Sequence, residues 1–487
     1  MTKKIQAVLC ASIGTVLCLT GCAPHKQVYQ QPQMPTAPAW HSSLSQPLPQ
    51  TPASTPAAAP TPAAAPAPAA AEVKWRDYYT DDKLRQVIDL ALKNNRDLRI
   101  AVLNVEKAMA QYRVQRANQF PQLDAVFSSD IYRVPGTLNQ SGSGGYISDT
   151  NKVGVQVSSW ELDLWGRLKN LSRQQMDLYL ASDQGRISTQ ISLIASVASQ
   201  YLTVGSDLET LHLAQATLES QKASYELTRQ IRDRGVDSDL DVSESLSQVQ
   251  SAQVDVVKYT RQLNVDENEL EVLVGAPVPA EILPSGFLSD EAFKDISAGV
   301  PSDVLLRRPD ILQAENNLKS SYANLASARA DYFPTIKLTA GAGITSGALA
   351  DLFKGGPGTW EFAPQISLPI FDAGSRNAKY NTAQVERDVY IADYEKAIQI
   401  AFQEVSDALN GRERLLDQEE AQQAEVKTLA ETYRLTDARY KAGIDNYLSV
   451  LVAQRSLYSG QQLLINTRLS RLSNQVTLYK VLAGGAQ

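Results

Sequence analysis

The apolar positions of residues 374–482 follow a seven-residue period that is broken once, at residues 441–446. After the break, an apolar or aromatic residue occupies every seventh position, at Leu451, Tyr458, Ile465, Leu472 and Tyr479. This period is typical of helices that pack as left-handed coiled coils. The region contains no proline, and at about 1.5 Å per residue the arm before the break would be roughly 100 Å long. The pattern predicts a long antiparallel helical hairpin at 374–483.

The hairpin has an earlier copy in the same chain. Several residues around the break recur at an offset of 208, and residues farther upstream recur at an offset of 213. The matching pairs include Tyr225 and Tyr433, Gly235 and Gly443, Asp237 and Asp445, Leu240 and Leu448, Asp97 and Asp310, and Pro121 and Pro334. Such self-similarity indicates a duplicated unit. We predict a first repeat at 75–275, with its helical hairpin at 166–275, a connector at 276–301, and a second repeat at 302–487.

Each repeat also contains a segment in which apolar and polar residues alternate, as in a β-strand. In the second repeat, two alternating runs flank a glycine-rich loop and predict a β-hairpin at about 333–372; the first repeat predicts one at about 120–165. Each strand is long enough to cross a bilayer at a tilt. A soluble sheet packed on a helix is the alternative. We favour the membrane, because the long helices pack on one another and Trp160, Trp165 and Trp360 near the strand ends suit an interface.

Four strands cannot close a barrel, and unpaired strand edges are not tolerated in hydrocarbon. Chains must therefore combine: two would give eight strands around a filled interior, and three would give twelve around a lumen. The predicted fold class is mainly α, with long coiled-coil helices that form an α-barrel and a membrane β-barrel part.

The amino terminus has the features of a bacterial lipoprotein. Residues 1–21 carry two lysines and then an apolar run too short to span a bilayer, as in a signal peptide. The run ends in a lipobox-like sequence at 19–22, so Cys22 is the predicted lipidation site; an ordinary signal with a chance cysteine is the alternative. Residues 22–74 are rich in proline and alanine and predict an extended tether.

Charge and composition argue against other classes of function. The net charge of −7 and the absence of a basic patch argue against nucleic-acid binding. The three histidines offer no zinc site and no Ser/His arrangement, so we expect neither a metal nor an enzyme, and no cofactor besides the lipid. The carboxylates lie on helical faces, where we expect solvation. Arg307 and Arg308 could suggest an anion site, but a capping and packing role fits their place before a helix better.

The chain resembles the TolC-like outer-membrane efflux channels, in particular their OprM-type lipoprotein branch. The resemblance rests on the lipobox, Leu-Arg-Arg-Pro-Asp-Ile at 306–311, Phe-Asp-Ala-Gly at 371–374, and the run from Arg439 to Leu448. It implies a homotrimer with a twelve-stranded barrel in the Gram-negative outer membrane and a helical tunnel across the periplasm. It also implies a periplasmic adaptor and an inner-membrane RND-type transporter as partners in drug efflux. Type I secretion, cation efflux, and a lipid-anchored coiled-coil spacer without a pore remain alternatives.

The resemblance also implies two kinds of site. The adaptor would dock on the two hairpin turns, whose residues are Arg234, Gly235, Val236 and Asp237 in the first and Ala442, Gly443, Ile444 and Asp445 in the second. These turns also simply end helices, with the glycines in left-handed positions. The pore would narrow nearby at Leu448, Val452 and Arg455, and Asp241 could meet Tyr440 between the hairpins.

Val452 departs from the family pattern, because relatives often carry aspartate at this position. Arg455 then requires another partner, such as Glu244 or water. Our hypothesis is that Leu448 and Val452 make the closed tip partly a hydrophobic constriction.

Overall fold

The computed structural model describes residues 29, 32, 73–135, 145–235, 238–296, 307–354 and 358–484. The predicted signal peptide, Cys22 and nearly all of the tether lie outside the described residues. The chain divides into two compact units. Unit 1 comprises Met1–Gln33, Val105–Ala181 and Ala314–Tyr394, and unit 2 comprises Met34–Asn104, Ser182–Gln313 and Glu395–Gln487.

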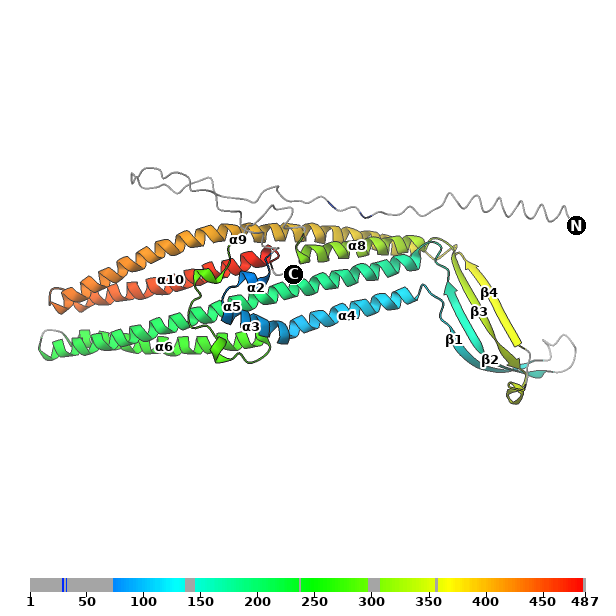
Figure 1. The fold of residues 1–487 in the computed structure, drawn as a ribbon, viewed down its shortest axis with the longest axis horizontal. Coiled ribbons are helices and arrows are strands. Elements are labelled where there is room, and N and C mark those ends of the chain that lie inside the picture. The colour runs from blue at the N-terminus through cyan, green and yellow to red at the C-terminus, as the bar shows by residue number, and fades with distance from the viewer. Residues whose placement is uncertain are drawn as a thin grey trace. The chain divides into compact units, whose positions relative to one another are not determined.

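The helices of the two repeats match in length (Figure 1). Helices α5 (Arg167–Asp233) and α9 (Ser375–Lys441) have 67 residues each and begin 208 positions apart. Their returning partners are α6 (Asp239–Val274) and α10 (Tyr447–Val481). Upstream, α4 (Arg96–Ala117) and α8 (Pro309–Ala330) have 22 residues each and begin 213 positions apart. The helical duplication therefore follows the two offsets found in the sequence.

The described residues also include shorter helical elements. They are α2 (Trp75–Tyr78), α3 (Asp82–Asn94) and the 3-10 turns η4 (Ala280–Ile282), η5 (Asp290–Ala292) and η6 (Leu349–Asp351). No helix in the described part of the chain combines the length and the apolar character needed to cross a membrane.

Unit 1 contains one antiparallel sheet with the strand order β1-β2-β3-β4 (Figure 1). The strands are β1 (Asp124–Val134), β2 (Tyr146–Glu161), β3 (Thr335–Ser346) and β4 (Gly358–Ser367). The pairing of β2 with β3 joins the hairpin of the first repeat to that of the second. Strand β4 ends before the predicted run does, and Pro369, which cannot donate a ladder hydrogen bond, follows two residues later.

Two glycines face each other where the hairpins of the two repeats meet. Gly154 on β2 pairs with Gly343 on β3, and a Cβ atom on either would strike the backbone of the opposite strand. Close approach of β2 and β3 therefore requires glycine at both positions. At the other side of the sheet, β4 is exposed along all ten of its residues. Strands β1 and β4 are the edges of the sheet within the described residues.

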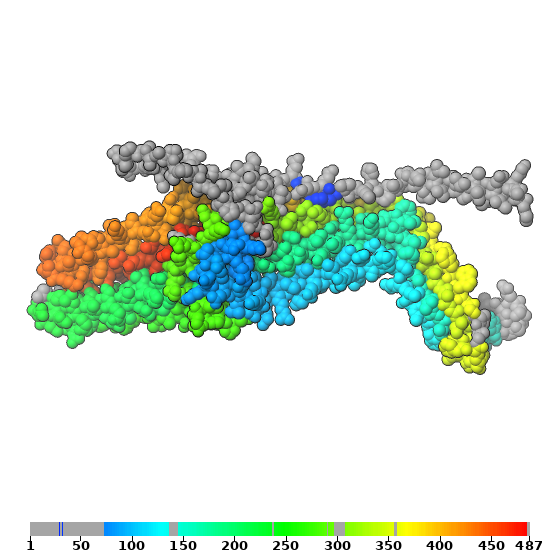
Figure 2. Space-filling view, viewed as in Figure 1, coloured from blue at the N-terminus to red at the C-terminus, as the bar shows by residue number. Residues whose placement is uncertain are grey.

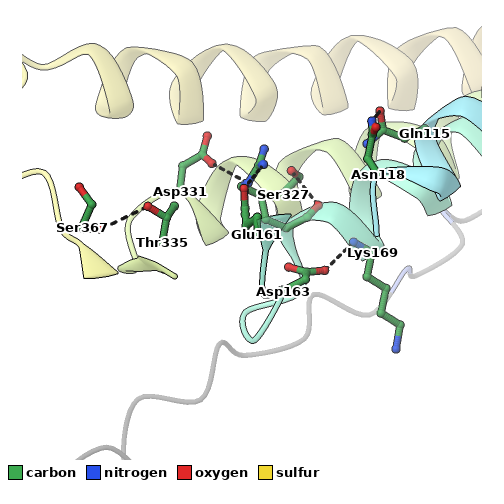
Figure 3. Close-up of polar contacts among 10 residues, drawn as sticks. Gln115, Asn118, Glu161, Asp163, Lys169, Ser327, Asp331, Thr335 and Ser367 are labelled. Atoms are coloured by element: carbon green, nitrogen blue, oxygen red, sulfur yellow. Dashed lines mark hydrogen bonds and ion pairs between the residues drawn. The ribbon is translucent and has the colours of Figure 1, made fainter. Parts of the chain in front are cut away.

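Polar contacts fix the junction between the sheet and α5 in unit 1 (Figure 3). Arg167 donates two hydrogen bonds of 2.8 and 2.6 Å to the carboxylate of Glu161, the last residue of β2. The Asp163 carboxylate accepts the backbone N–H of Lys169 at 2.7 Å, and the Ser327 hydroxyl donates to the Arg167 carbonyl at 3.3 Å. These contacts connect the end of a strand, the start of α5 and the adjacent α8.

In the main hydrophobic core of unit 2, residues from Val73 onward pack against the last helix, α10. The ring of Tyr78 stacks on that of Tyr479 at a centroid distance of 4.0 Å. The Tyr479 hydroxyl donates to the Val73 carbonyl at 2.6 Å, and the Tyr78 hydroxyl donates to the Gln475 carbonyl at 2.8 Å. Apolar residues of α3, α5, α6, α9 and α10 pack around them. Contacts distant in sequence thus hold the centre of unit 2.

Arg308 connects three helices in unit 2. Its buried guanidinium donates to the Asp310 carboxylate, to Glu404 Oε2 at 2.6 Å and to the Val481 carbonyl at 3.1 Å. These acceptors lie at the start of α8, within α9 and at the end of α10. The interpretation of this arginine as a capping and packing residue is confirmed.

Candidate channel tip and constriction

The first tip turn, between α5 and α6 in unit 2, ends α5 with a left-handed glycine. Gly235 has φ of 79°, and its N–H donates to the Arg232 carbonyl at 2.8 Å. Ser238 then caps α6 in a capping box with Asp241, and Arg232 bridges the turn with an ion pair of 3.0 Å to Asp239. Val236 and Asp237, two of the predicted docking residues, lie outside the described residues.

The second tip turn, between α9 and α10, has the complete hydrogen bonding of a Schellman motif. Gly443, with φ of 68°, donates to the Tyr440 carbonyl at 2.8 Å, and Ile444 donates to the Arg439 carbonyl at 2.9 Å. The Arg439 guanidinium also binds both carboxylate oxygens of Asp445, at 2.6 and 3.0 Å. The exposed Ala442, Gly443 and Ile444 thus form a rigid, accessible turn.

Both tip turns lie at the same end of unit 2, where the green and orange helix ends come together (Figure 2). No atom lies within 4 Å of a Cβ built on Gly235 or Gly443, so only the backbone conformation calls for glycine there. The turns therefore present open surface that a partner protein can contact.

The predicted constriction residues share one face of α10. Leu448, Val452 and Arg455 are three to four positions apart, and the side chains of Leu448 and Val452 remain 56% and 57% exposed. The neighbouring residues Val450 and Leu451 are instead buried in a small apolar cluster. Within the described residues, Arg455 is exposed and makes no hydrogen bond or ion pair with the rest of its own chain, so its predicted pairing with Glu244 does not occur within one chain.

Tyr440 is buried between the two hairpins rather than presented to the surface. Its hydroxyl lies 3.2 Å from that of Thr228 on α5, and its ring contacts the ring of Tyr447 at 5.7 Å. The Asp241 carboxylate, its predicted partner, accepts hydrogen bonds from the backbone N–H and the hydroxyl of Ser238. In this single chain, Tyr440 therefore helps to hold the hairpins together.

Sequence reasoning missed Thr228 and Tyr447 at this site. The offset of 208 could have drawn attention to Tyr447. It shows that Tyr440 and Tyr447 occupy the positions equivalent to Arg232 and Asp239 of the first repeat. The same offset pairs Thr228 with Thr436, but it gives no sign that Thr228 lies beside Tyr440. In the described part of the chain, no group of three or more His, Cys, Asp or Glu side chains could hold a metal ion.

The model of the family "Outer membrane efflux protein" matches residues 87–276 and 300–484, one match for each repeat. The chain is 44% identical over 485 residues to the antibiotic efflux pump outer membrane protein ArpC of Pseudomonas putida, covering 100% of this chain and 96% of that protein. The toluene efflux pump outer membrane protein TtgC of Pseudomonas putida has the same identity and coverage. The open-state crystal structure of the Neisseria gonorrhoeae MtrE outer membrane channel is similar with a TM-score of 0.80 and 34% identity, covering 95% of this chain and 99% of that one.

The chain belongs to the outer membrane efflux protein family. The resemblance inferred from the sequence is thereby confirmed, and so is the mainly helical fold with a four-stranded antiparallel sheet. Membership of this family of outer membrane proteins also supports the prediction that this efflux protein is not an enzyme.

Proposed function

We propose that this outer membrane efflux protein is the passive exit duct of a tripartite efflux pump. It conducts drugs or other small toxic compounds from the periplasmic side to the exterior. The names of relatives 44% identical, which refer to antibiotic and to toluene efflux pumps, support this class of cargo. In the assembly, a periplasmic adaptor contacts the tip turns and an inner-membrane RND-type transporter selects and drives the cargo.

The observation that carries the proposal is the open four-stranded sheet. Strand β4 is exposed along its whole length, and β1 forms the opposite edge within the described residues. Such edges must pair with another strand when they lie in hydrocarbon. Three copies bring twelve strands together and leave a lumen, whereas two copies bring eight strands whose side chains fill the interior. A conducting assembly is therefore a homotrimer.

The amino-terminal features complete the proposal. Removal of residues 1–21 and lipidation of Cys22 would add acyl chains beside the barrel and hold residues 22–74 as a tether at the outer membrane. Besides this lipid, we propose no cofactor for the duct.

Purified protein in planar bilayers tests the duct directly. We expect a trimeric mass and single-channel conductance, together with restored drug resistance when the gene is returned to a deletion strain. A monomer that leaves the bilayer sealed would instead indicate the lipid-anchored spacer. A deletion strain that exports drugs normally but loses secretion of a protein, or tolerance to a metal cation, would favour type I secretion or cation efflux.

A further inference from the structure

Tyr29 precedes the described helices and strands in sequence and contacts helix α8 within unit 1. Its hydroxyl donates to Glu315 Oε1 on α8 at 3.1 Å. Its ring meets the edge of the Tyr322 ring at a centroid distance of 5.7 Å, and the Lys319 ammonium lies 5.4 Å from its ring centre. One tyrosine thus makes a hydrogen bond, an aromatic contact and a cation–π contact with a single helix face.

The surface that receives Tyr29 is organised by its own contacts. We call Glu315, Lys319 and Tyr322 the α8 cradle. Lys319 bridges to Glu315 at 2.9 Å, one helical turn away, and the guanidinium of Arg387 on α9 lies 5.9 Å from the Tyr322 ring. Burial, and then the Glu315 carboxylate, raises the pKa of the Tyr29 hydroxyl, so the hydroxyl stays protonated and can donate. The cradle is therefore shaped for a neutral aromatic ring with a donor at its tip.

The position of Tyr29 in the chain gives this contact a consequence. Tyr29 is seven positions after Cys22, so an extended chain could carry Cys22 at most about 25 Å from the cradle. A tether fixed only from Val73 onward would instead be some fifty residues long, counted from Cys22. A proline-rich segment of that length could reach well over 100 Å.

The distance from the cradle to the sheet is of the same size as the short tether. Lys319 precedes the end of α8 at Ala330 by 11 residues and the first residue of β3, Thr335, by 16. At about 1.5 Å per helical residue, the cradle lies roughly 20–30 Å along the chain from the strands. An acyl chain on Cys22 can therefore just reach the bilayer surface around the sheet.

We propose that Tyr29 is a positioning residue that fixes how far the lipid on Cys22 can move from the strands of the same chain. This inference rests on the lipidation of Cys22 proposed above. The α8 cradle receives the tyrosine, and the length of chain between Cys22 and Tyr29, which we call the ruler, sets the reach of the lipid. The lipid then enters the membrane beside the barrel at a set distance from the α8 helix.

Chymotrypsin cleavage in outer-membrane vesicles tests the contact, because the enzyme cuts after both Tyr29 and Trp40 in the same tether. The ratio of cutting after Tyr29 to cutting after Trp40, followed by mass spectrometry, corrects for general access. We expect Tyr322→Ala to raise this ratio by about tenfold and Tyr29→Phe, which loses only the hydrogen bond, to raise it less. An unchanged ratio in both variants overturns the proposal.

Two deletions of equal length test the ruler. Deletion of residues 25–28 shortens the segment between Cys22 and Tyr29 by about 14 Å and should pull Tyr29 from the cradle, raising the ratio. Deletion of residues 57–60 removes as many residues from the later tether and should leave the ratio unchanged.

The same pair of deletions, in a form secreted with an ordinary signal peptide and carrying Cys22→Ser, separates the ruler from lipidation. Without lipid, deletion of residues 25–28 should no longer raise the ratio; an equal rise with and without lipid overturns the ruler. If mass spectrometry finds no acyl group on wild-type Cys22 while Tyr29 stays protected, the lipidation proposal and the ruler fail and the cradle alone stands.

Discussion

Arg232 and Asp239 form a 3.0 Å ion pair across the first tip turn, at the positions where the second repeat has Tyr440 and Tyr447. The ion pair is open to solvent, with side-chain exposures of 38% and 88%. The tyrosine pair is buried and reaches Thr228 of the other hairpin. The two repeats therefore use the same two register positions differently: for a surface ion pair in the first repeat and for a buried connection between hairpins in the second.

The two tips should respond differently to truncation. Asp239→Ala should cost well under 1 kcal/mol, because exposed ion pairs contribute little. Tyr440→Ala should destabilise the protein by about 3 kcal/mol or more, because it empties a buried site. Tyr440→Phe, which removes only the hydroxyl near Thr228, should cost about 1 kcal/mol. Denaturation of the purified trimer measures the stability lost in each variant. Equal losses of stability for Asp239→Ala and Tyr440→Ala would contradict the prediction.

Leu448 and Val452 should limit flow through the closed tip. If their exposed side chains form an apolar ring around the pore, Leu448→Ala and Val452→Ala should each raise single-channel conductance by about twofold or more. Leu435→Ala, which truncates an exposed leucine on α9, is the matched control and should conduct like the wild type. If the three variants have the same conductance in planar bilayers, the hypothesis of a hydrophobic constriction is wrong.

Arg308 should contribute more to stability than its neighbour in the sequence. Arg308→Ala leaves Asp310, Glu404 and the Val481 carbonyl without their shared donor. It should cost about 2 kcal/mol, less than for a fully buried pair, because the two carboxylates remain 39% and 44% exposed. Arg308→Lys should recover only part of this, because an ammonium cannot reproduce the fork of the guanidinium. The exposed Arg307 provides the control, and Arg307→Ala should cost much less. Similar unfolding midpoints for Arg307→Ala and Arg308→Ala would show that the three-helix contact contributes little.

A carboxyl pair between α5 and α6 should make stability depend on pH. Burial, and then the hydrogen bond and charge of Asp266, raises the pKa of Asp207 to about 8. Burial also acts on Asp266, but hydrogen bonds from Asp207, Gln262 and Gln200 outweigh it and lower the pKa of Asp266. The two carboxyl groups thus share one proton near neutral pH.

The sign of the effect follows from Asp207, which titrates near pH 4 when unfolded. Between about pH 4 and 8 the unfolded chain has released this proton and the folded chain still holds it, so stability falls as pH rises through that window. Asp207→Asn should therefore reduce the fall in melting temperature between pH 6 and pH 8.5. The exposed Asp417→Asn should leave the fall as in the wild type. A fall that Asp207→Asn leaves intact would exclude this pair as its source.

The sequence predicted the helical hairpins and the strands because their periodicities are long and regular. Seven-residue spacing sustained over 67-residue helices identifies these segments as helical, and the repeat offsets give independent support for the helix lengths. The strand end at Ser367 was less well placed, since alternation continues past the last ladder hydrogen bond.

The side-chain partners within the hairpins could not be predicted in the same way. Carboxylates on the helices were expected to be solvated, yet Glu419 is buried in an ion pair with Arg471 between α9 and α10, and that expectation is wrong. The matching positions of the first repeat hold Leu211 and Leu263. A heptad pattern shows that a position faces a neighbour, but not whether the neighbour supplies an apolar or a charged partner.

The tyrosine stack at the centre of unit 2 sets an order on the assembly of the chain. Tyr479 holds both the ring of Tyr78 and the carbonyl of Val73, across a sequence separation of 406 residues for the latter. If the chain crosses the inner membrane amino end first, this contact can form only after almost the whole chain has crossed. A truncation at the carboxyl end that removes Tyr479 would therefore leave Val73 and Tyr78 without the residue that they contact.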